Sequence, residues 1–332
     1  MANYKGIKGF KVQSLASDPS TTSDTEGKVW YNTAGNALKY VEAGAGAWAA
    51  GGTMGTARYY AGIAGDKSAM LIFGGGPGQT AVTESYNGTA WTEVNDLNTA
   101  RDQIRGCGTQ TAALGVAGNV HPVLQALTEK WNGTSWTESG DINTARRSGN
   151  AMGTTTAAIY CGGYSGPPNT SPGWRNETET YDGSTWTEVA DMNTARFYSG
   201  GAGAFTSALV FGGFPPGSPG NKLTESWNGT SWTEVNDLTT LISENGGAGT
   251  STSSVLSMGG FGASGATTAC EKFNGTSWAA SPALTTARSA NPGSSSGPTS
   301  ACMVLGGNAP TVSATTEEFT DPVYGVKTVT TT

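Results

Sequence analysis

The sequence predicts an all-β fold of repeated four-stranded sheets, and three observations support this prediction. The block Tyr86–Arg101 recurs along the chain in close copies, and a looser copy occupies Tyr40–Arg58. Each unit holds four short strand-like segments without helical periodicity, and Gly makes up 50 of the 332 residues, which disfavours helices. Six tryptophans mark the units at intervals of 43 to 50 residues, a period typical of β-propeller blades. The close copies are Trp131–Arg146, Tyr181–Arg196, Trp227–Ile242 and Phe273–Arg288.

Residues 1–45 precede the regular part of the chain and are predicted to form an arm and a β-hairpin. Leu15–Glu26 is polar and reads as a loop, whereas residues 28–41 read as two short strands around a Gly-containing turn. We expect this segment to serve attachment or oligomerisation.

At the other end, residues 322–332 are predicted to form an extended tail. Val323–Thr332 alternates apolar and polar residues, as an additional strand does. This strand belongs either to its own domain or to a pairing with another subunit, and the sequence leaves both open.

Residues 46–321 are predicted to form one domain of units with a common order. A strand of small residues is followed by an apolar strand that ends in Gly-Gly, except in the second unit with V-A-G-N at 116–119, and two further strands join through Asn-Gly or Asp-Gly in all but the last set. These dipeptides favour two-residue type I′ turns. Such a turn at Asn87-Gly88 places Tyr86 opposite Thr89 and Glu84 opposite Trp91, with all four side chains on one face.

Counting the strands predicts how the domain closes. There are six sets of the first three strands, five fourth strands that follow them, and one fourth strand around Trp48 with no set before it. The economical solution is a six-bladed β-propeller in which the Trp48 strand completes the last blade and removes the free sheet edges.

The hydrophobic run, the Gly-Gly pair, the aromatic residue and the Trp together resemble the kelch repeat. The resemblance covers roughly residues 46–320 and implies a β-propeller of kelch-like four-stranded blades. It carries no particular function with it.

The N-terminal segment resembles another group of proteins. The resemblance rests on three segments: K-G-I-K-G-F-K-V-Q-S-L at 5–15, G-K-V-W-Y-N-T at 27–33, and N-A-L-K-Y followed by A-W. They are similar to the start of virion structural proteins, fibres or decoration proteins, of marine and cyanobacterial bacteriophages. The resemblance implies a multi-copy or homo-oligomeric protein of the virion, assembled in the host cytoplasm and extracellular in the particle. Its partners would be other virion proteins, contacted through residues 1–45 and the C-terminal tail.

The repeat carries six glutamates at one position and five arginines at another. They are compatible with a catalytic ring, but structural pairing explains them better, because an unpaired buried charge is costly and a carboxylate accepts a guanidinium. We therefore expect most of these arginines to contact a repeat glutamate. The residues are Glu84, Glu129, Glu179, Glu225, Glu271 and Glu317, with Arg58, Arg101, Arg146, Arg196 and Arg288.

The repeat aromatics, which include the six tryptophans, are either sugar-binding platforms or buried packing residues. Blades pack face to face, which favours burial, and we expect Trp30 and Trp174 to be the exceptions.

Binding is predicted instead on the loops that do not repeat. The longest is Tyr164–Asn176, and its counterpart in the next unit is Phe214–Lys222. Variable loops on a rigid scaffold are where binding sites concentrate. Trp174 and Arg175, with Tyr164 and Phe214, are our candidates for contact with a host-surface glycan or protein.

Composition excludes several classes of function. A net charge of −7 with 18 Lys and Arg argues against nucleic acid, and no apolar run is long enough for membrane insertion. The N-terminus lacks a signal-peptide core. His121 is the single histidine and the four cysteines lack metal-ligand spacing, so we predict no metal, no cofactor and buried thiols.

No acid pair stands out from the repeat, so we predict no catalytic residue and a protein that is not an enzyme. The predicted function is that of a phage fibre, decoration or adhesin component that presents a propeller for binding. The alternatives are a polysaccharide-acting enzyme of a phage tail and a cellular kelch-like interaction scaffold.

Overall fold

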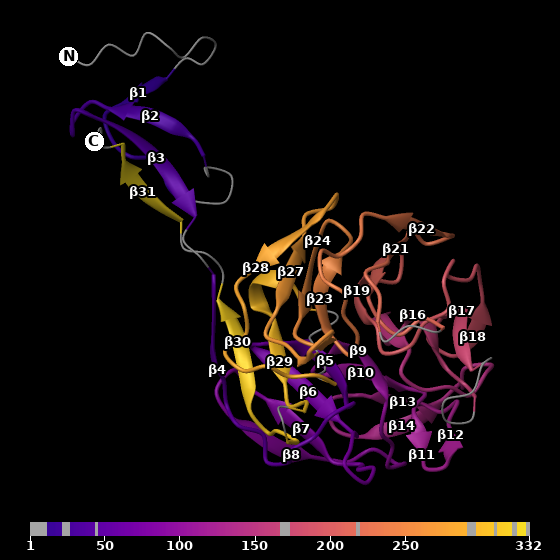
Figure 1. Cartoon of the computed structure of the whole chain (residues 1–332). Coiled ribbons are helices and arrows are strands. Elements are labelled where there is room, and N and C mark those ends of the chain that lie inside the picture. The colour runs from indigo at the N-terminus through magenta and orange to yellow at the C-terminus, as the bar shows by residue number, and fades with distance from the viewer. Residues whose placement is uncertain are drawn as a thin grey trace. The chain divides into compact units, whose positions relative to one another are not determined.

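The computed structural model describes residues 12–21, 27–43, 46–166, 173–216, 220–290, 297–308, 311–320 and 324–329 (Figure 1). These residues form β-strands and one short 3-10 helix, η2 (Thr299–Ala301), so the fold is all-β as predicted. Within these ranges there is no helix with the length and apolarity that crossing a bilayer requires. The chain divides into two compact units, one made of residues 1–47 with 321–332 and the other of residues 48–320.

The first unit is a four-stranded sheet in the order β1-β2-β3-β31. Its strands are β1 (Gln13–Leu15), β2 (Val29–Asn32), β3 (Ala37–Ala43) and β31 (Tyr324–Thr328). β1 runs parallel to β2, and the other neighbours are antiparallel. The hairpin expected within residues 28–41 is therefore present as β2 and β3.

The C-terminal stretch is not a separate tail. β31 pairs with β3 of the same chain, from Lys39 opposite Thr328 to Ala43 opposite Tyr324. This pairing satisfies the backbone N–H and C=O groups along the outer edge of β3, which is the physical reason for the strand to fold back. Of the two outcomes that the sequence left open, the structure thus shows the tail on its own chain.

Trp30 is buried, contrary to the expectation that it would be an exception. Its side chain is 2% exposed, and its indole N–H donates to Asp18 Oδ1 at 3.2 Å. Asp18 also accepts from Asn32 and forms an ion pair with Lys39 at 2.8 Å. The hydrogen bonds from Lys39 and Asn32 lower the pKa of Asp18. One carboxylate thus ties the polar segment after β1 to both strands of the hairpin.

The second unit contains repeated antiparallel sheets, and five of them have four strands each. The first is β5 (Gly62–Asp66), β6 (Ala69–Phe73), β7 (Thr83–Tyr86) and β8 (Trp91–Val94). The second is β9 (Arg105–Thr109), β10 (Ala112–Val116), β13 (Thr128–Trp131) and β14 (Trp136–Ser139). The third is β15 (Asn150–Thr154), β16 (Ala157–Tyr164), β17 (Trp174–Tyr181) and β18 (Trp186–Glu188). The fourth is β19 (Gly200–Ala204), β20 (Ser207–Phe211), β21 (Thr224–Trp227) and β22 (Trp232–Val235). The fifth is β23 (Gly246–Ser251), β24 (Ser254–Met258), β27 (Cys270–Phe273) and β28 (Trp278–Ser281).

Two short ribbons and a last sheet complete this unit. The ribbons are β11 (Asn119–Val120) with β12 (Val123–Leu124), and β25 (Phe261–Gly262) with β26 (Gly265–Ala266). The last sheet has three strands in the order β29 (Met303–Leu305), β30 (Thr316–Thr320) and β4 (Ala47–Ala50). The N-terminal strand β4 therefore lies beside β30 from near the C-terminus, as Figure 1 shows, so the Trp48 strand completes the last sheet as the strand count predicted. The first strand expected for the last unit falls on residues 291–296, outside the described residues, and η2 lies between them and β29.

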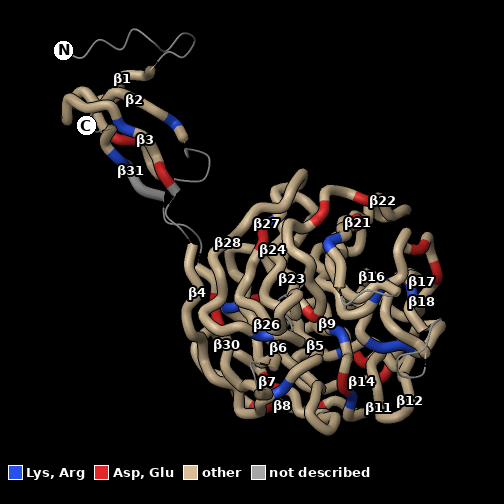
Figure 2. The backbone as a smooth tube through the Cα atoms, viewed as in Figure 1, with Lys and Arg blue, Asp and Glu red and all other residues tan. Residues whose placement is uncertain are grey.

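The first strand of each sheet is rich in small residues because these strands approach one another closely. A Cβ atom on Gly106 would lie 2.4 Å from Ile63 O of the neighbouring first strand, and one on Gly247 would lie equally close to Gly201 O. The second strands carry the apolar residues, which are fully buried and pack between consecutive sheets. The core therefore lies in layers between the sheets, and Figure 2 shows few charged positions along this unit.

The turn between the third and fourth strands differs from the prediction. The loop has four residues rather than two, because Asn87 N donates to Ala90 O and Asn87 Oδ1 accepts from the N–H groups of Thr89 and Ala90. Tyr86 consequently lies opposite Trp91, and Glu84 lies opposite Glu93. The physical reason is that the Asn side-chain oxygen accepts hydrogen bonds from its own loop and so stabilises the longer turn.

Candidate functional site

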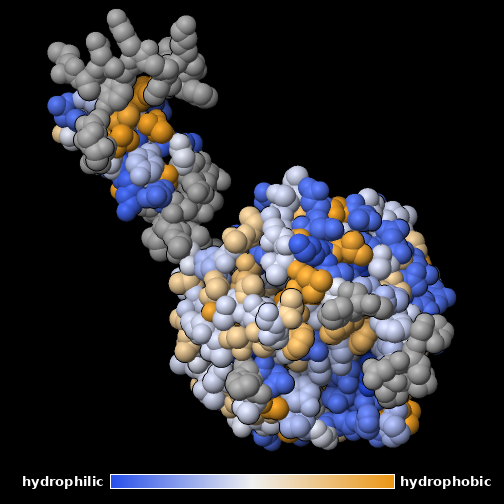
Figure 3. All heavy atoms as spheres, in the orientation of Figure 1, coloured by the Kyte–Doolittle hydropathy of each residue, from blue (hydrophilic) through white to orange (hydrophobic). Residues whose placement is uncertain are grey.

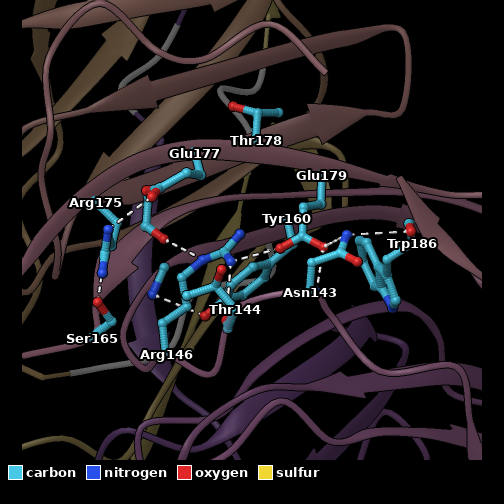
Figure 4. A network of polar contacts seen from close by, with 12 residues as sticks. Asn143, Thr144, Arg146, Tyr160, Ser165, Arg175, Glu177, Thr178, Glu179 and Trp186 are labelled. Carbon is cyan, nitrogen blue, oxygen red and sulfur yellow. Dashed lines mark hydrogen bonds and ion pairs between the residues drawn. The ribbon is translucent and has the colours of Figure 1, made fainter. Parts of the chain in front are cut away.

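The repeat charges form buried ion pairs within the sheets. Arg101 Nη2 lies 2.8 Å from Glu129, Arg146 Nη1 lies 2.6 Å from Glu179, and Arg288 Nη2 lies 2.8 Å from Glu317. Arg58 pairs with Glu84, and Arg196 with Glu225, in the same way. Figure 4 shows the Arg146 pair, where the guanidinium also lies over the Tyr160 ring at 4.9 Å.

Each pair is part of a larger backbone network rather than a bidentate contact. Arg101 Nη1 donates to Ala117 O at 2.8 Å and to Leu127 O at 2.7 Å, while the second oxygen of Glu129 accepts from Asn98 N at 2.7 Å. Burial lowers the pKa of Arg101, and the charge of Glu129 opposes this shift. Such groups hold strand ends together and are shielded from any substrate.

The sixth glutamate has no arginine, because Ile242 occupies the equivalent position. Glu271 instead accepts from the N–H groups of Thr239 at 2.7 Å and Thr240 at 2.9 Å. Among the described residues, the hydrogen bonds to this carboxylate come from backbone donors, and Glu271 is 6% exposed.

The repeat aromatics are packing residues. All the third-strand aromatics are buried, and five of the six repeat tryptophans are at most 7% exposed, with Trp91 half-buried. Four indole N–H groups donate to a threonine of the preceding sheet: Trp136 to Thr83, Trp186 to Thr128, Trp232 to Thr178 and Trp278 to Thr224. Their rings are covered, so they are not sugar-binding platforms.

Cys107, Cys161, Cys270 and Cys302 are all buried and none forms a disulfide. No group of three or more potential metal ligands occurs in the part of the chain that the structure describes. His121 is exposed at the turn between β11 and β12, where its Nδ1 lies 3.0 Å from Asn119 Nδ2.

We expect the thiols to be unreactive in the folded protein. Burial raises the pKa of Cys107, Cys161 and Cys270 to about 12, so almost no thiolate exists at pH 8. Ellman's reagent should label none of these residues in buffer and all four cysteines in guanidinium chloride. Rapid labelling of the native protein would contradict this result.

Outside the repeat motif, each of the six units contains one equivalent isolated β-bridge, and its residues differ from unit to unit. The residue after each repeat Arg, or after Ile242, forms an isolated bridge with the residue that follows the Gly-Gly position. The six bridges are Tyr59–Gly76, Asp102–Asn119, Arg147–Tyr164, Phe197–Phe214, Ser243–Phe261 and Ser289–Asn308. The backbone is thus constant while the side chains vary, and we call these residues the variable face.

We give the name inner ring to the set formed by the next residue of each unit. These residues all have positive φ between 51° and 58°, which is uncommon outside Gly: Tyr60, Gln103, Ser148, Tyr198, Glu244 and Ala290. Neighbouring members bond through the backbone, as in Tyr198 N to Ser148 O at 3.0 Å and Glu244 N to Tyr198 O at 2.7 Å. The sequence analysis did not single out these residues, although the pair that follows each repeat Arg, or Ile242, is different in every copy.

Side chains of the inner ring also meet. The rings of Tyr60 and Tyr198 stack with centroids 4.7 Å apart. Tyr198 donates its hydroxyl to Gln103 Oε1 at 2.7 Å, and Tyr60 donates to Glu244 Oε1 at 2.8 Å. Burial is the main cause of the raised pKa values of both tyrosines. Residues from distant parts of the sequence therefore form one polar and aromatic cluster.

The four residues predicted to bind a ligand lie on or beside the variable face. Tyr164 is buried, whereas Trp174, Arg175 and Phe214 are half-buried. Phe197 joins their rings, with centroids 5.2 Å from Tyr164, 6.4 Å from Trp174 and 5.5 Å from Phe214. Trp174 thus packs against the next unit, and Arg175 is engaged with Glu177 at 2.9 Å.

Two cavities accompany these features. One of about 320 Å³ is lined by Tyr59, Tyr60, Glu244, Phe261, Ser289 and Asn308, which belong to the variable face and inner ring. The other, of about 350 Å³, lies at the first-hairpin turns and is lined by Thr109, Thr154, Thr155, Gly203, Ala204 and Thr250. Figure 3 shows small hydrophobic patches among hydrophilic surface on the visible side of this unit.

No protein-family model matches the sequence, and a comparison with curated proteins finds no match. The structure therefore defines the class of this protein: an all-β protein of repeated antiparallel sheets. Buried ion pairs stabilise these sheets, and the variable face carries residues that do not repeat.

Proposed function

We propose that the second unit is a closed six-bladed β-propeller of kelch-like blades. Three contacts between its first and last parts support closure: the place of β4 beside β30, Gly307 N to Arg58 O at 2.9 Å, and Tyr60 N to Ala290 O at 3.1 Å. Lys67 N also donates to Ala301 O at 3.0 Å. In this arrangement the inner ring surrounds the propeller axis.

The propeller is a binding protein without enzymatic activity, and the variable face is its binding surface. The observation that carries this proposal is that six equivalent bridges keep one backbone geometry and carry six different side-chain pairs. Residues that serve only the fold repeat, as the Arg–Glu pairs do, whereas recognition needs a surface without repetition. The ligand is a host-surface glycan or a protein.

The biological setting that fits the N-terminal resemblance is the virion of a bacteriophage. In this proposal the protein is a fibre, decoration or adhesin component, and the sheet of β1, β2, β3 and β31 attaches it to other virion proteins. This sheet combines three strands from the N-terminal part of the chain with β31 from the C-terminal part.

Two variants should separate attachment from binding. Particles made with a protein lacking residues 1–27 should contain none of it, because β1 and its approach to β2 are removed. Particles carrying Trp174→Ala should contain normal amounts but adsorb more slowly to host cells, because Trp174 and Phe197 would no longer pack. Mass spectrometry of purified particles and an adsorption assay measure the two effects.

Thr233→Ala, an exposed change on β22, is the matched control and should alter neither quantity. Normal incorporation of the shortened protein would refute the attachment role. Unchanged adsorption with Trp174→Ala and with Phe214→Ala would refute the binding role of this part of the face.

A further inference from the structure

The cavity of about 320 Å³ holds a carboxylate whose charge is not matched by an ion pair. Among the described residues, no Lys, Arg or His nitrogen lies within 4 Å of a Glu244 oxygen. Arg105 lies close enough for the charge of Glu244 to raise its pKa against the effect of burial, but Arg105 Nε donates to Gly149 O at 2.7 Å and forms no ion pair with Glu244 among the described residues. A half-buried carboxylate without a direct ion pair favours a cationic ligand over a neutral one.

The hydrogen bonding of Glu244 restricts the shape of that cation. Tyr60 donates its hydroxyl to Glu244 Oε1 at 2.8 Å, so one oxygen is already engaged. A guanidinium is bound best by both carboxylate oxygens, whereas an ammonium acts as a compact point charge and needs only one. The remaining oxygen therefore suits a primary ammonium, whose other N–H groups have Asn308 and Ser289 as further acceptors in the lining.

The rest of the lining suits an aliphatic chain. Tyr59 packs edge-on against Tyr60 with centroids 5.2 Å apart, and Phe261 is 42% exposed. Aromatic walls of this kind cover the methylene groups of a long side chain while its charged end reaches the carboxylate.

We propose that this cavity binds the side chain of a lysine presented by a protein partner. The proposal rests on the proposed binding function of the variable face and names the chemistry that one part of that face recognises. The acidic net charge of −7 favours the approach of a basic partner.

Titration calorimetry of the full chain with Nα-acetyl-lysine methylamide tests the proposal. We expect millimolar binding that falls at least about tenfold when the probe is acetylated on Nε, because acetylation removes the charge. Glu244→Gln should cause a similar loss. The inner ring accepts this substitution, because Gln103 has φ 53° at the equivalent position where Glu244 has φ 54°.

Glu234→Gln is the matched control, since it removes one negative charge from an exposed position on β22 and should leave the affinity unchanged. Equal binding of the acetylated probe, or full binding by Glu244→Gln, would overturn the proposal. Equal affinity for Nα-acetyl-arginine methylamide would overturn the inference that the one remaining Glu244 oxygen selects an ammonium over a guanidinium. Tighter binding of glucosamine than of the lysine probe would assign the cavity to amino sugars instead.

The outcome is separable from that of the proposed function. If the lysine probe fails to bind but Trp174→Ala still slows adsorption, the variable face binds host cells, and only the proposal that the cavity binds lysine is refuted. If the probe binds but Trp174→Ala and Phe214→Ala leave adsorption unchanged, the cavity binds lysine and the proposed adhesin role is refuted.

Discussion

Replacing Arg101 by Met should destabilise the protein by about 3–5 kcal/mol, because the change leaves a buried carboxylate without its cation. Glu129 is 1% exposed and would keep only its backbone donor, Asn98 N at 2.7 Å. The carbonyl groups of Ala117 and Leu127 would lose their shared donor as well. Denaturation followed by tryptophan fluorescence measures the loss.

Two controls determine whether the buried charge causes this effect. The double variant Arg101→Met with Glu129→Gln should regain most of the stability, since the uncompensated charge is gone and an acceptor for Asn98 N remains. Arg175→Met removes a half-exposed ion pair and should cost less than about 1 kcal/mol. A loss below about 1 kcal/mol for Arg101→Met would show that backbone donors suffice, as they do at Glu271 beside Ile242.

Replacing Trp48 by Ala should also cost about 3–5 kcal/mol, because a large buried side chain leaves a cavity at the junction of the first and last strands. Trp48 is 6% exposed, its ring centroid lies 5.2 Å from that of Phe319, and its indole donates to Pro282 O at 2.9 Å. It thus joins β4 both to β30 and to the segment after β28. Thermal and denaturant unfolding measure this loss.

Trp91 provides the matched control for this prediction. It occupies the equivalent repeat position and also donates its indole N–H, here to Gly52 O at 3.0 Å, but its side chain is half-buried. Trp91→Ala should therefore be clearly milder than Trp48→Ala. Equal losses would mean that the position in the repeat matters more than the closure through β4.

Much of the fold was readable from repeated residues. The period of the tryptophans and the Gly-Gly pairs predicted units of four strands, and five such sheets are present. The pairing of the repeat arginines with glutamates followed from the cost of burying either charge alone. The four-residue loop at Asn87 was missed, because the same Asn-Gly dipeptide fits two loop lengths and the choice depends on which backbone groups the Asn side chain accepts.

The candidate site was predicted less well than the scaffold. Tyr164, Trp174 and Phe214 were chosen from loop length, and the structure adds Phe197, which brings their rings together. Tyr60 and Glu244 are 184 residues apart in the chain, so their hydrogen bond leaves no local trace in the sequence.

The sequence by itself determined the repeating unit of this protein, since strand, turn and ion-pair residues interact within one unit and so recur with its period. Tertiary structure decided where the non-repeating residues meet. The cavity at Glu244 combines Tyr59, Phe261 and Asn308 from three different units. It decided equally that β31 returns to β3, which the sequence had left open, whereas the strand count had already predicted that the Trp48 strand β4 joins the last sheet. The physical reason is that backbone edges and variable side chains select their partners by proximity in space, which the order of residues along the chain does not encode.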